Sequence, residues 1–244
     1  MGMIFLYTDF GLEGPYVGQM RAAIQRQAPG LQVVDLCHDL PPFDPRSAAY
    51  LLAALVPFLP EGCCVVGVVD PGVGSERGAV VLEADGRWFV GPDNGLFAIT
   101  ARHAHKADWR SLAWRPQGMS ASFHGRDLFA PAGARAVTGR PPETAALDGP
   151  VGMEWPEELA EIIYIDHYGN AMTGLPGSRV ASDSVLHAGG RRFPPARTFS
   201  DLPPGGAFWY VNSCGLVELA LNQDSAARVI GLATGTAVDV SEPD

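Results

Sequence analysis

The first 150 residues alternate short apolar runs with segments of helical spacing, and this alternation constrains the fold more than any other feature. Three apolar runs are typical of buried strands: 4–8, 31–36 and 63–69. A hairpin is indicated by two further runs around Asp85-Gly86, at 79–83 and 88–90. Helical patterns lie at 17–28, 44–59, 93–104 and 127–137. This order predicts an N-terminal α/β domain with a mostly parallel sheet that helices cover on both faces.

The pattern changes near residue 150. Four prolines mark the crossing: Pro141, Pro142, Pro150 and Pro156. Short strand candidates separated by turn residues follow, at 162–165, 185–187, 208–211, 229–232 and 237–240. We therefore expect two domains, 1–150 and 151–244, the second being a smaller C-terminal β domain, a barrel or a sandwich.

Charge and cysteine content exclude several classes of function. The chain has 17 basic and 27 acidic residues, a net charge of −10. A nucleic-acid-binding protein needs a basic face, and so does docking on anionic lipid. The four cysteines form no Cys-x-x-Cys pair, so we expect no thiolate metal site and a reducing, cytoplasmic location. The apolar N-terminus lacks a basic flank and is expected to be a strand, and no apolar run is long enough for a membrane span.

Acidic loops follow three of the predicted strands. They carry Asp9, Asp70 and Asp93. Ligands of open α/β sheets bind at the carboxyl ends of parallel strands, so these loops are expected to meet at one edge. Each aspartate alone could equally form a turn or cap a helix.

The sharpest local pattern is Asp70-Pro-Gly-Val-Gly, followed by Arg77 seven residues after the aspartate. The glycines allow a tight turn that returns the guanidinium to the carboxylate. The Asp70–Arg77 pair could be a structural ion pair that holds the loop together, or it could take part in catalysis. His124 lies before a helix that Asp127 could cap, and a histidine beside Asp and Arg can position or polarise a water.

Two polar turns stand out in the second part. Asp166, Tyr168 and Asn170 lie in a turn where the ring could stack on a purine and the amide could bind its edge. Asn212-Ser213-x-Gly215, with Glu218 nearby, could meet a sugar or a base. An ordinary β-turn explains either segment alone.

Seven segments together resemble the S-adenosylmethionine (SAM) hydroxide adenosyltransferases, or SAM hydrolases, which are relatives of fluorinase and chlorinase. They are T-D-F-G at 8–11, H-D-L-P-P-F-D at 38–44, V-D-P-G-V-G at 69–74 with Arg77, G-P-D-N-G-L at 91–96, F-H-G-R-D-L-F-A-P at 123–131, I-D-H-Y-G-N at 165–170 and N-S-x-G at 212–215. The resemblance covers nearly the whole chain. It implies an N-terminal α/β domain, a C-terminal β-barrel and a homotrimer whose sites lie between subunits.

The resemblance also implies residue roles. Asp70, Arg77 and His124 would handle the attacking water. Asp9 would hold the ribose hydroxyls and Phe43, a tryptophan in the halogenases, would lie near the ribose. The remaining substrate contacts would be Asp166 at the methionine amine, Tyr168 and Asn170 at the adenine, Ser213 at the methionine carboxylate and Glu218 as a further contact. Cys214 stands where the halogenases have an arginine.

Departures from the halogenases imply water as the nucleophile. The halogenases lack the Asp70–Arg77 pair, and fluorinase has its halide-binding serine at the position of Gly125. The implied reaction is hydrolysis of SAM to adenosine and L-methionine by attack at the ribose 5′ carbon, without metal or cofactor. Two alternatives stay open. One is a metal-dependent hydrolase using Asp9, Asp70, Asp93 and His124, and the other is a nucleoside-binding protein without turnover.

Overall fold

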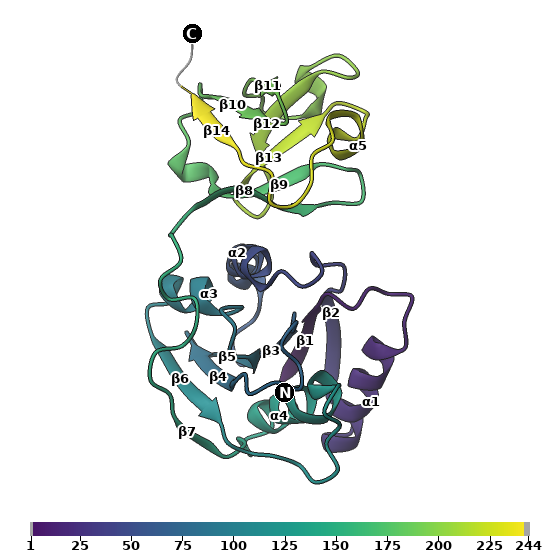
Figure 1. Cartoon of the computed structure of the whole chain (residues 1–244), viewed down its shortest axis with the longest axis vertical. Helices are drawn as coiled ribbons and strands as arrows, with labels where there is room; N and C mark the ends of the chain where they lie inside the picture. Colours follow the sequence, from purple (N-terminus) through teal and green to yellow (C-terminus); the bar gives the residue numbers. More distant parts are fainter. Residues whose placement is uncertain (1, 242–244) are drawn as a thin grey trace. The chain divides into compact units, whose positions relative to one another are not determined.

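The computed structural model describes residues 2–241 and divides into two compact units (Figure 1). The first unit ends at Trp155 and the second begins at Pro156. Each unit has a hydrophobic cluster of its own. Within the described residues, no helix combines the length and apolar character needed to cross a membrane.

The first unit is built on a seven-stranded sheet of order β2-β1-β3-β5-β4-β6-β7. Strands β2, β1, β3 and β5 are parallel to one another, whereas β4 runs antiparallel to β5 and β6, and β7 antiparallel to β6. The predicted large, mostly parallel sheet is therefore confirmed. The strands are β1 (Met3–Thr8), β2 (Gln32–Cys37), β3 (Cys64–Val68), β4 (Ala79–Ala84), β5 (Arg87–Pro92), β6 (Ala107–Leu112) and β7 (Thr144–Ala146).

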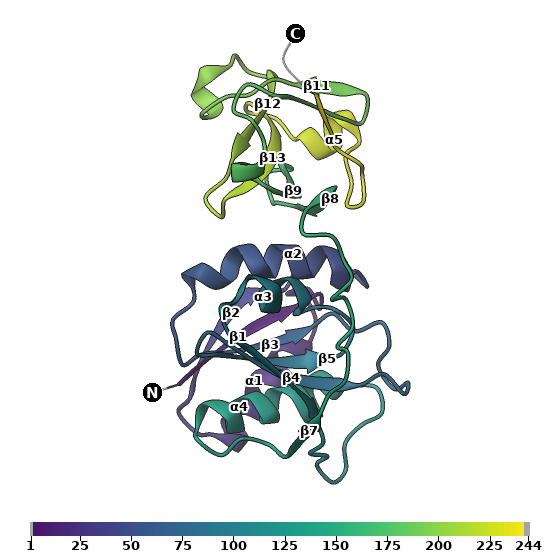
Figure 2. The ribbon, with the colours of Figure 1, turned by 90° about the vertical axis from the view of Figure 1, so that its left-hand side faces the viewer.

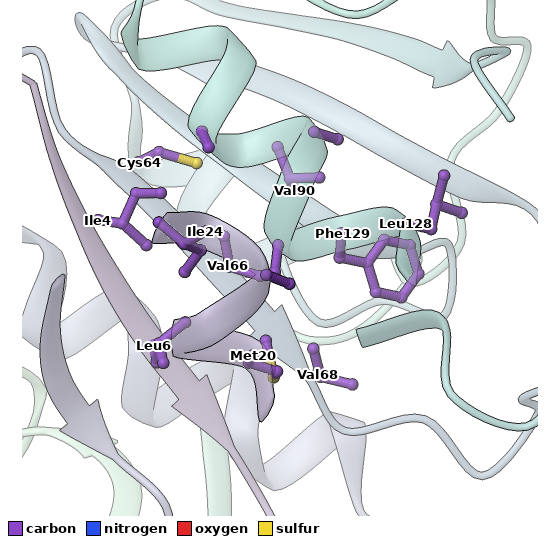
Figure 3. Packing of buried hydrophobic residues seen from close by; sticks show 14 of the residues in the cluster. Ile4, Leu6, Met20, Ile24, Cys64, Val66, Val68, Val90, Leu128 and Phe129 are labelled. Carbon is purple, nitrogen blue, oxygen red and sulfur yellow. The ribbon is translucent and has the colours of Figure 1, made fainter. Parts of the chain in front are cut away.

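Helices cover both faces of this sheet, α1 and α4 on one and α2 and α3 on the other (Figure 2). They are α1 (Tyr16–Gln27), α2 (Pro45–Leu55, continued by the 3₁₀ turn η1, Val56–Phe58), α3 (Ala98–His103) and α4 (Ala130–Val137). The predicted cap of α2 is confirmed, because the Asp44 side chain accepts a hydrogen bond from Ser47 N at 3.0 Å. Core side chains of α1 and of the turn that leads into α4 pack with those of the central strands (Figure 3), for example Met20, Ile24, Val66, Leu128 and Phe129.

One predicted cap is wrong. The helical segment after His124 begins as the five-residue π-helix η2 (Gly125–Phe129), and no side chain caps it. Asp127 instead binds the Arg126 guanidinium, with Nε–Oδ1 at 2.6 Å, and accepts a hydrogen bond from Ser120 N at 2.9 Å. The carboxylate thereby fixes the loop before the helix.

The second unit contains two antiparallel sheets, ordered β12-β13-β9-β8 and β11-β10-β14. The predicted strand at 229–232 is wrong: this segment ends helix α5 (Ala226–Ile230), which the Ser225 side chain caps and Gly231 (φ 79°) terminates. The other elements are β8 (Leu159–Ile165), β9 (Ala171–Pro176), η3 (Gly177–Arg179), β10 (Val185–Ala188), β11 (Arg191–Phe193), η4 (Phe199–Asp201), β12 (Ala207–Val211), β13 (Leu216–Leu221) and β14 (Asp239–Ser241).

Candidate active site

Two carboxylates meet at the carboxyl edge of the parallel strands. Asp9 follows β1 and Asp70 lies two residues after β3, the neighbour of β1 in the sheet. Both line a cavity of about 400 Å³, which we call the front cavity, together with Phe10, Phe43 and His124. The third aspartate, Asp93, follows β5 at the same edge, but its carboxylate accepts a hydrogen bond from Val151 N at 3.1 Å. Two of the three predicted carboxylates thus share a cavity.

The Arg77 guanidinium joins the predicted carboxylate and imidazole. Its Nη2 donates to Asp70 Oδ2 at 2.6 Å and lies 3.0 Å from His124 Nδ1. Only 10 % of the Arg77 side chain and 5 % of the Asp70 side chain are exposed, so this ion pair is shielded from water. The second carboxylate oxygen, Asp70 Oδ1, is buried and has no hydrogen-bond partner among the described residues. One oxygen is therefore neutralised by Arg77 and the other is free to accept a proton.

The glycine-rich loop explains why Arg77 returns to Asp70. Gly74 has φ +81°, which favours glycine, and turns the chain back after Asp70. Ser75 Oγ donates to Gly72 O at 2.7 Å and accepts from Arg77 N at 3.2 Å, which fixes the returning strand. The sequence prediction of a tight turn closing an Asp–Arg pair is confirmed.

The hydrogen bond to Arg77 determines the state of His124. A guanidinium can only donate, so His124 Nδ1 accepts and the neutral ring carries its proton on Nε2. Burial and the nearby Arg77 charge lower the pKa of His124, which favours the neutral ring. Burial raises the pKa of Asp70 although Arg77 opposes the shift. Of these two groups, Asp70 has the vacant acceptor.

Phe129 packs against both Arg77 and His124. The π-helix places its fully buried ring 5.4 Å from the Arg77 Cζ atom, and its edge contacts the His124 ring at a centroid distance of 6.4 Å. A cation over an aromatic face is stabilised by the ring quadrupole. Sequence analysis missed this residue because a buried phenylalanine after a histidine is an ordinary core pattern.

Asp9 and Phe43 are also brought together. Asp9 Oδ2 accepts a hydrogen bond from Phe43 N at 3.1 Å, and the Phe43 backbone has φ 62°. Burial, together with the charge of Asp70, raises the pKa of Asp9. The Phe43 ring is 75 % exposed at the rim of the front cavity. This rim has an apolar surface that nothing within the first unit covers among the described residues.

Gly125 lies against three apolar side chains at the front cavity. A Cβ at this position would lie 3.3 Å from Phe123 and 3.4 Å from both Phe10 and Met20. The distance to Phe123 is shorter than an ordinary contact and the other two are at its lower limit, so a larger residue requires the Phe123 ring to shift by a few tenths of an ångström. Phe10, Tyr16 and Phe123 form a small aromatic cluster, in which Phe123 packs edge to face with both other rings and Phe10 is tilted against Tyr16.

The second unit has a larger cavity of about 940 Å³, lined by Asp166, Tyr168 and Asn170. The Asp166 carboxylate accepts hydrogen bonds from Asn170 N at 2.8 Å and Asn170 Nδ2 at 3.0 Å, which closes the turn. Gly169 is required there, because its backbone has φ +86° and a Cβ would lie 2.0 Å from Ser225 Oγ. Tyr168 is 76 % exposed at the tip of this turn. The turn and a ligand-sized cavity therefore coincide.

Sequence reasoning missed several residues that line this second-unit cavity. They are Phe199, Tyr210, Asn222, Gln223 and Arg228. Phe199 packs edge to face on Tyr210 with a centroid distance of 5.3 Å. Strand β13, which the sequence analysis did not predict, ends at Leu221 in the cavity wall. Its mainly apolar segment 216–221 is the signal that could have identified the strand and, directly after it, the lining residues Asn222 and Gln223.

Ser213 and Glu218 are placed differently. Ser213 is exposed on the turn after β12. Glu218 is 2 % exposed, and its two oxygens accept hydrogen bonds from Tyr210 Oη at 2.6 Å and Asn212 Nδ2 at 2.8 Å. Burial raises the pKa of Glu218. With both oxygens occupied, Glu218 holds Tyr210 and the Asn212 turn in place.

The residues of the metal-dependent alternative do not form a ligand cluster in the described part of the chain. Within residues 2–241, no three His, Cys, Asp or Glu side chains are grouped so that they could hold a metal ion. The alternative built on Asp9, Asp70, Asp93 and His124 therefore lacks a ligand cluster, since Asp93 binds Val151 N.

Family models match both units. The N-terminal domain of SAM hydroxide adenosyltransferase matches residues 4–146, and the C-terminal domain of the same family matches residues 160–239. The chain belongs to the SAM hydroxide adenosyltransferase family. The resemblance stated from the sequence is thereby confirmed, and the family's two domains correspond to the two units.

Curated relatives extend over nearly the full length. The chain is 42 % identical to the (R)-S-adenosyl-L-methionine hydrolase of Thermus thermophilus, over 98 % of this chain and 99 % of that protein. It is 39 % identical to the protein of the same name from Salinispora arenicola, over 96 % of this chain and 95 % of that protein. A fluorinase from Nocardia brasiliensis is more distant, at 25 % identity over 98 % and 96 %.

A solved structure supports the fold. The crystal structure of an uncharacterized conserved protein from Thermotoga maritima superposes with a TM-score of 0.87 at 28 % identity, covering 98 % of this chain and 100 % of that one. The fold is thus shared with a protein of known structure.

Proposed function

We propose that this chain hydrolyses SAM to adenosine and L-methionine by attack of water on the ribose 5′ carbon. The observation that carries the proposal is the contact of Arg77 with both Asp70 and His124 at the front cavity. Its relatives at 36–42 % identity are named as hydrolases of this compound. The geometry supplies what an attacking water needs: a proton acceptor, a fixed donor and a cationic stabiliser.

The proton of the attacking water goes to Asp70. Its Oδ1 is the vacant acceptor, whereas His124 Nδ1 is occupied by Arg77 and Nε2 carries a proton. Desolvation makes the carboxylate a stronger base than an exposed aspartate. His124 Nε2–H then orients the water, and Arg77 stabilises the hydroxide-like charge that develops on it.

The leaving group needs no assistance. The C5′–S bond breaks with its electron pair going to sulfur, which turns a sulfonium into a neutral thioether. No general acid is required on that side, and we propose that the reaction needs neither metal nor cofactor. The carboxylates Asp9 and Asp70 and the net charge of −10 suit a cationic substrate.

The two cavities divide the recognition of the substrate. We assign Asp9 to the ribose hydroxyls and Phe43 to the ribose face. In the second unit, Tyr168 and Asn170 hold adenine and Asp166 the methionine amine, while Ser213 on the exposed turn meets the methionine carboxylate. Glu218 acts through Tyr210 and Asn212. These assignments follow the family resemblance, and the cavity positions of Asp9, Phe43, Asp166, Tyr168 and Asn170 support them.

We further propose a homotrimer in which the first unit of one subunit and the second unit of another enclose one substrate. Exposed aromatic side chains at the rims of both cavities, Phe43 and Tyr168, support a site completed by assembly. The single bridges Glu161–Ala237 and Pro195–Trp209 link strands around the second unit and support its description as a barrel. Light scattering on the purified protein tests the mass of the assembly.

A reducing, cytoplasmic compartment is the location we propose. Among the described residues, no disulfide joins any of the cysteines Cys37, Cys63, Cys64 and Cys214. Fractionation of the native cells, probed with an antibody, tests this assignment.

The decisive experiment follows SAM by chromatography and mass spectrometry in H₂¹⁸O. We expect adenosine and methionine in equal amounts and one ¹⁸O atom on the 5′ oxygen of adenosine. Label in methionine, or no label in adenosine, would contradict attack at this carbon. Binding without turnover would favour the nucleoside-binding alternative, and activity lost on dialysis against a chelator would favour the metal-dependent one.

A further inference from the structure

The loop that carries Arg77 separates the front cavity from another cavity. Val73 lines the front cavity, whereas the next residues of the loop, from Gly74 to Arg77, line a space of about 430 Å³. We call this space the rear cavity. Ser75, Glu76 and Arg115 give it a polar lining, and Ala121 also contributes to it.

The wall between the two cavities is thin. His124 lines both of them. Beside it, the wall consists of the 3.0 Å contact between Arg77 Nη2 and His124 Nδ1, and of the close approach of two loops. A Cβ on Gly74 would lie 2.9 Å from the carbonyl oxygen of Ala121, so the loops touch only because this residue is glycine.

Arg77 offers a free donor near the rear cavity. Its Nε atom is buried and has no hydrogen-bond partner among the described residues, although the side chain is 90 % shielded. A buried guanidinium donor without a partner is costly, and water is the common partner that satisfies such groups. A water that enters the wall from the rear cavity, which Arg77 and His124 line, would satisfy this donor.

The proposed reaction creates a demand for water on this side. In-line displacement puts the nucleophile opposite the sulfur, and the substrate fills the front cavity in the meantime. Each turnover forms one O–C5′ bond, breaks one C5′–S bond and leaves one proton on Asp70, so a water must be replaced and a proton removed every cycle. The Arg77–His124 side is where both must pass once substrate is bound.

We propose that the rear cavity is the entry by which water reaches the Asp70–Arg77–His124 cluster when substrate occupies the front cavity. This inference rests on the proposed function and extends it to the supply of the second substrate. Water would cross beside His124, which lines both cavities and which, with Arg77, borders the rear cavity.

A plug in the rear cavity tests the proposal. Ala121 is exposed and lines this cavity, so Ala121→Trp fills it without entering the core. Gln117→Trp is the matched control, because Gln117 is exposed on the same loop but lines a different cavity. Ala121→Ser keeps the cavity open. We expect Ala121→Trp to lower kcat about tenfold or more, since an access step then limits turnover, with both other variants near wild type.

Three readouts keep the result decisive. The KM for SAM, the affinity for adenosine and the shape of the kcat–pH profile should not change in Ala121→Trp, because access alone is altered. An unchanged kcat overturns the proposal. A fall in kcat with weakened adenosine binding or a displaced pH profile also overturns it, because the substitution then acts on the cluster itself. If the wild-type protein releases no adenosine from SAM, the proposed function fails before this test begins.

Discussion

The two units hold their polar groups in opposite ways. In the first unit, Asp70 and His124 line a small cavity and are joined by Arg77, and burial shifts the pKa values of Asp70 and His124. In the second unit, Asp166 and Asn170 satisfy each other within one turn beside a cavity more than twice as large. The first arrangement leaves one oxygen of Asp70 without a hydrogen-bond partner among the described residues. In the second, the hydrogen bonds between Asp166 and Asn170 fix the conformation of the turn.

This contrast indicates a division of labour. Perturbed pKa values in a cleft are typical of groups that carry chemistry. A rigid turn that presents an exposed ring is typical of groups that recognise a ligand. We therefore expect substitutions in the first unit to affect mainly kcat and those in the second unit to affect mainly KM. Three experiments test this separation of effects on kcat and KM, and a fourth tests the stability of the second unit.

The largest effect should come from Asp70→Asn. The amide keeps the shape but cannot accept the proton, so kcat should fall about 10²- to 10⁴-fold. Affinity for adenosine should stay close to wild type in calorimetry. Asp108→Asn is the control, since Asp108 lies in an exposed pair with Arg110. An Asp70→Asn variant with a raised KM and unchanged kcat would remove the distinction between the units.

Tyr168→Ala should act on binding instead. Stacking of a base on an aromatic ring contributes about 1–3 kcal/mol, so KM should rise about 5- to 150-fold while kcat changes little. Steady-state kinetics with SAM measure this. Phe58→Ala, which removes another exposed ring, is the matched control. A loss confined to kcat would place Tyr168 in the chemistry and contradict the comparison.

The pH dependence of kcat should report the first unit alone. Activity requires ionised Asp70, whose pKa is raised by burial, so kcat should fall about tenfold per pH unit below that pKa and level off above it. Burial and the charge of Arg77 lower the pKa of His124, which extends its neutral form to more acidic pH. Profiles of wild type and Tyr168→Ala should superpose after scaling. A shift between them would show that the second unit influences the acid–base groups.

The smallest effect concerns the stability of the second unit. The folded-state pKa of Glu218 is raised by burial, so its contribution to stability is full below the ordinary pKa of a glutamate and is lost as pH rises through the raised value. Urea unfolding of Glu218→Gln should therefore depend less on pH across this window than unfolding of wild type. Equal slopes for the two proteins would show that Glu218 titrates normally.

Patterns of apolar residues predicted the first unit well and the second less well. The parallel strands are continuous apolar runs because both faces are buried, as Cys64–Val68 shows. The strand Ala107–Leu112, which lies between β4 and the edge strand β7, is polar and half exposed, so its sequence carries no strand signal. The segment around Val229 is apolar but helical, because Ser225 caps it and Gly231 ends it. Cap signals outweighed β-branched residues there.

Contacts in the candidate site were predictable where the two residues are close in the sequence. Asp70 and Arg77 are seven residues apart, so the glycines between them already imply their contact. His124 is 47 residues from Arg77, so its local sequence suggested a role for the histidine, but only the family motifs grouped it with Asp70 and Arg77. The vacancy at Asp70 Oδ1 and the tautomer of His124 depend on three-dimensional contacts that no spacing encodes.

The crowding around Gly125 restricts how this protein could evolve. A residue bearing a hydroxyl at that position would place its Cβ 3.3 Å from Phe123 and in contact with Phe10 and Met20, and both phenylalanines also line the front cavity. A mutational path from hydrolysis toward halide transfer would therefore couple the exchange at this glycine to small shifts of the aromatic side chains around it.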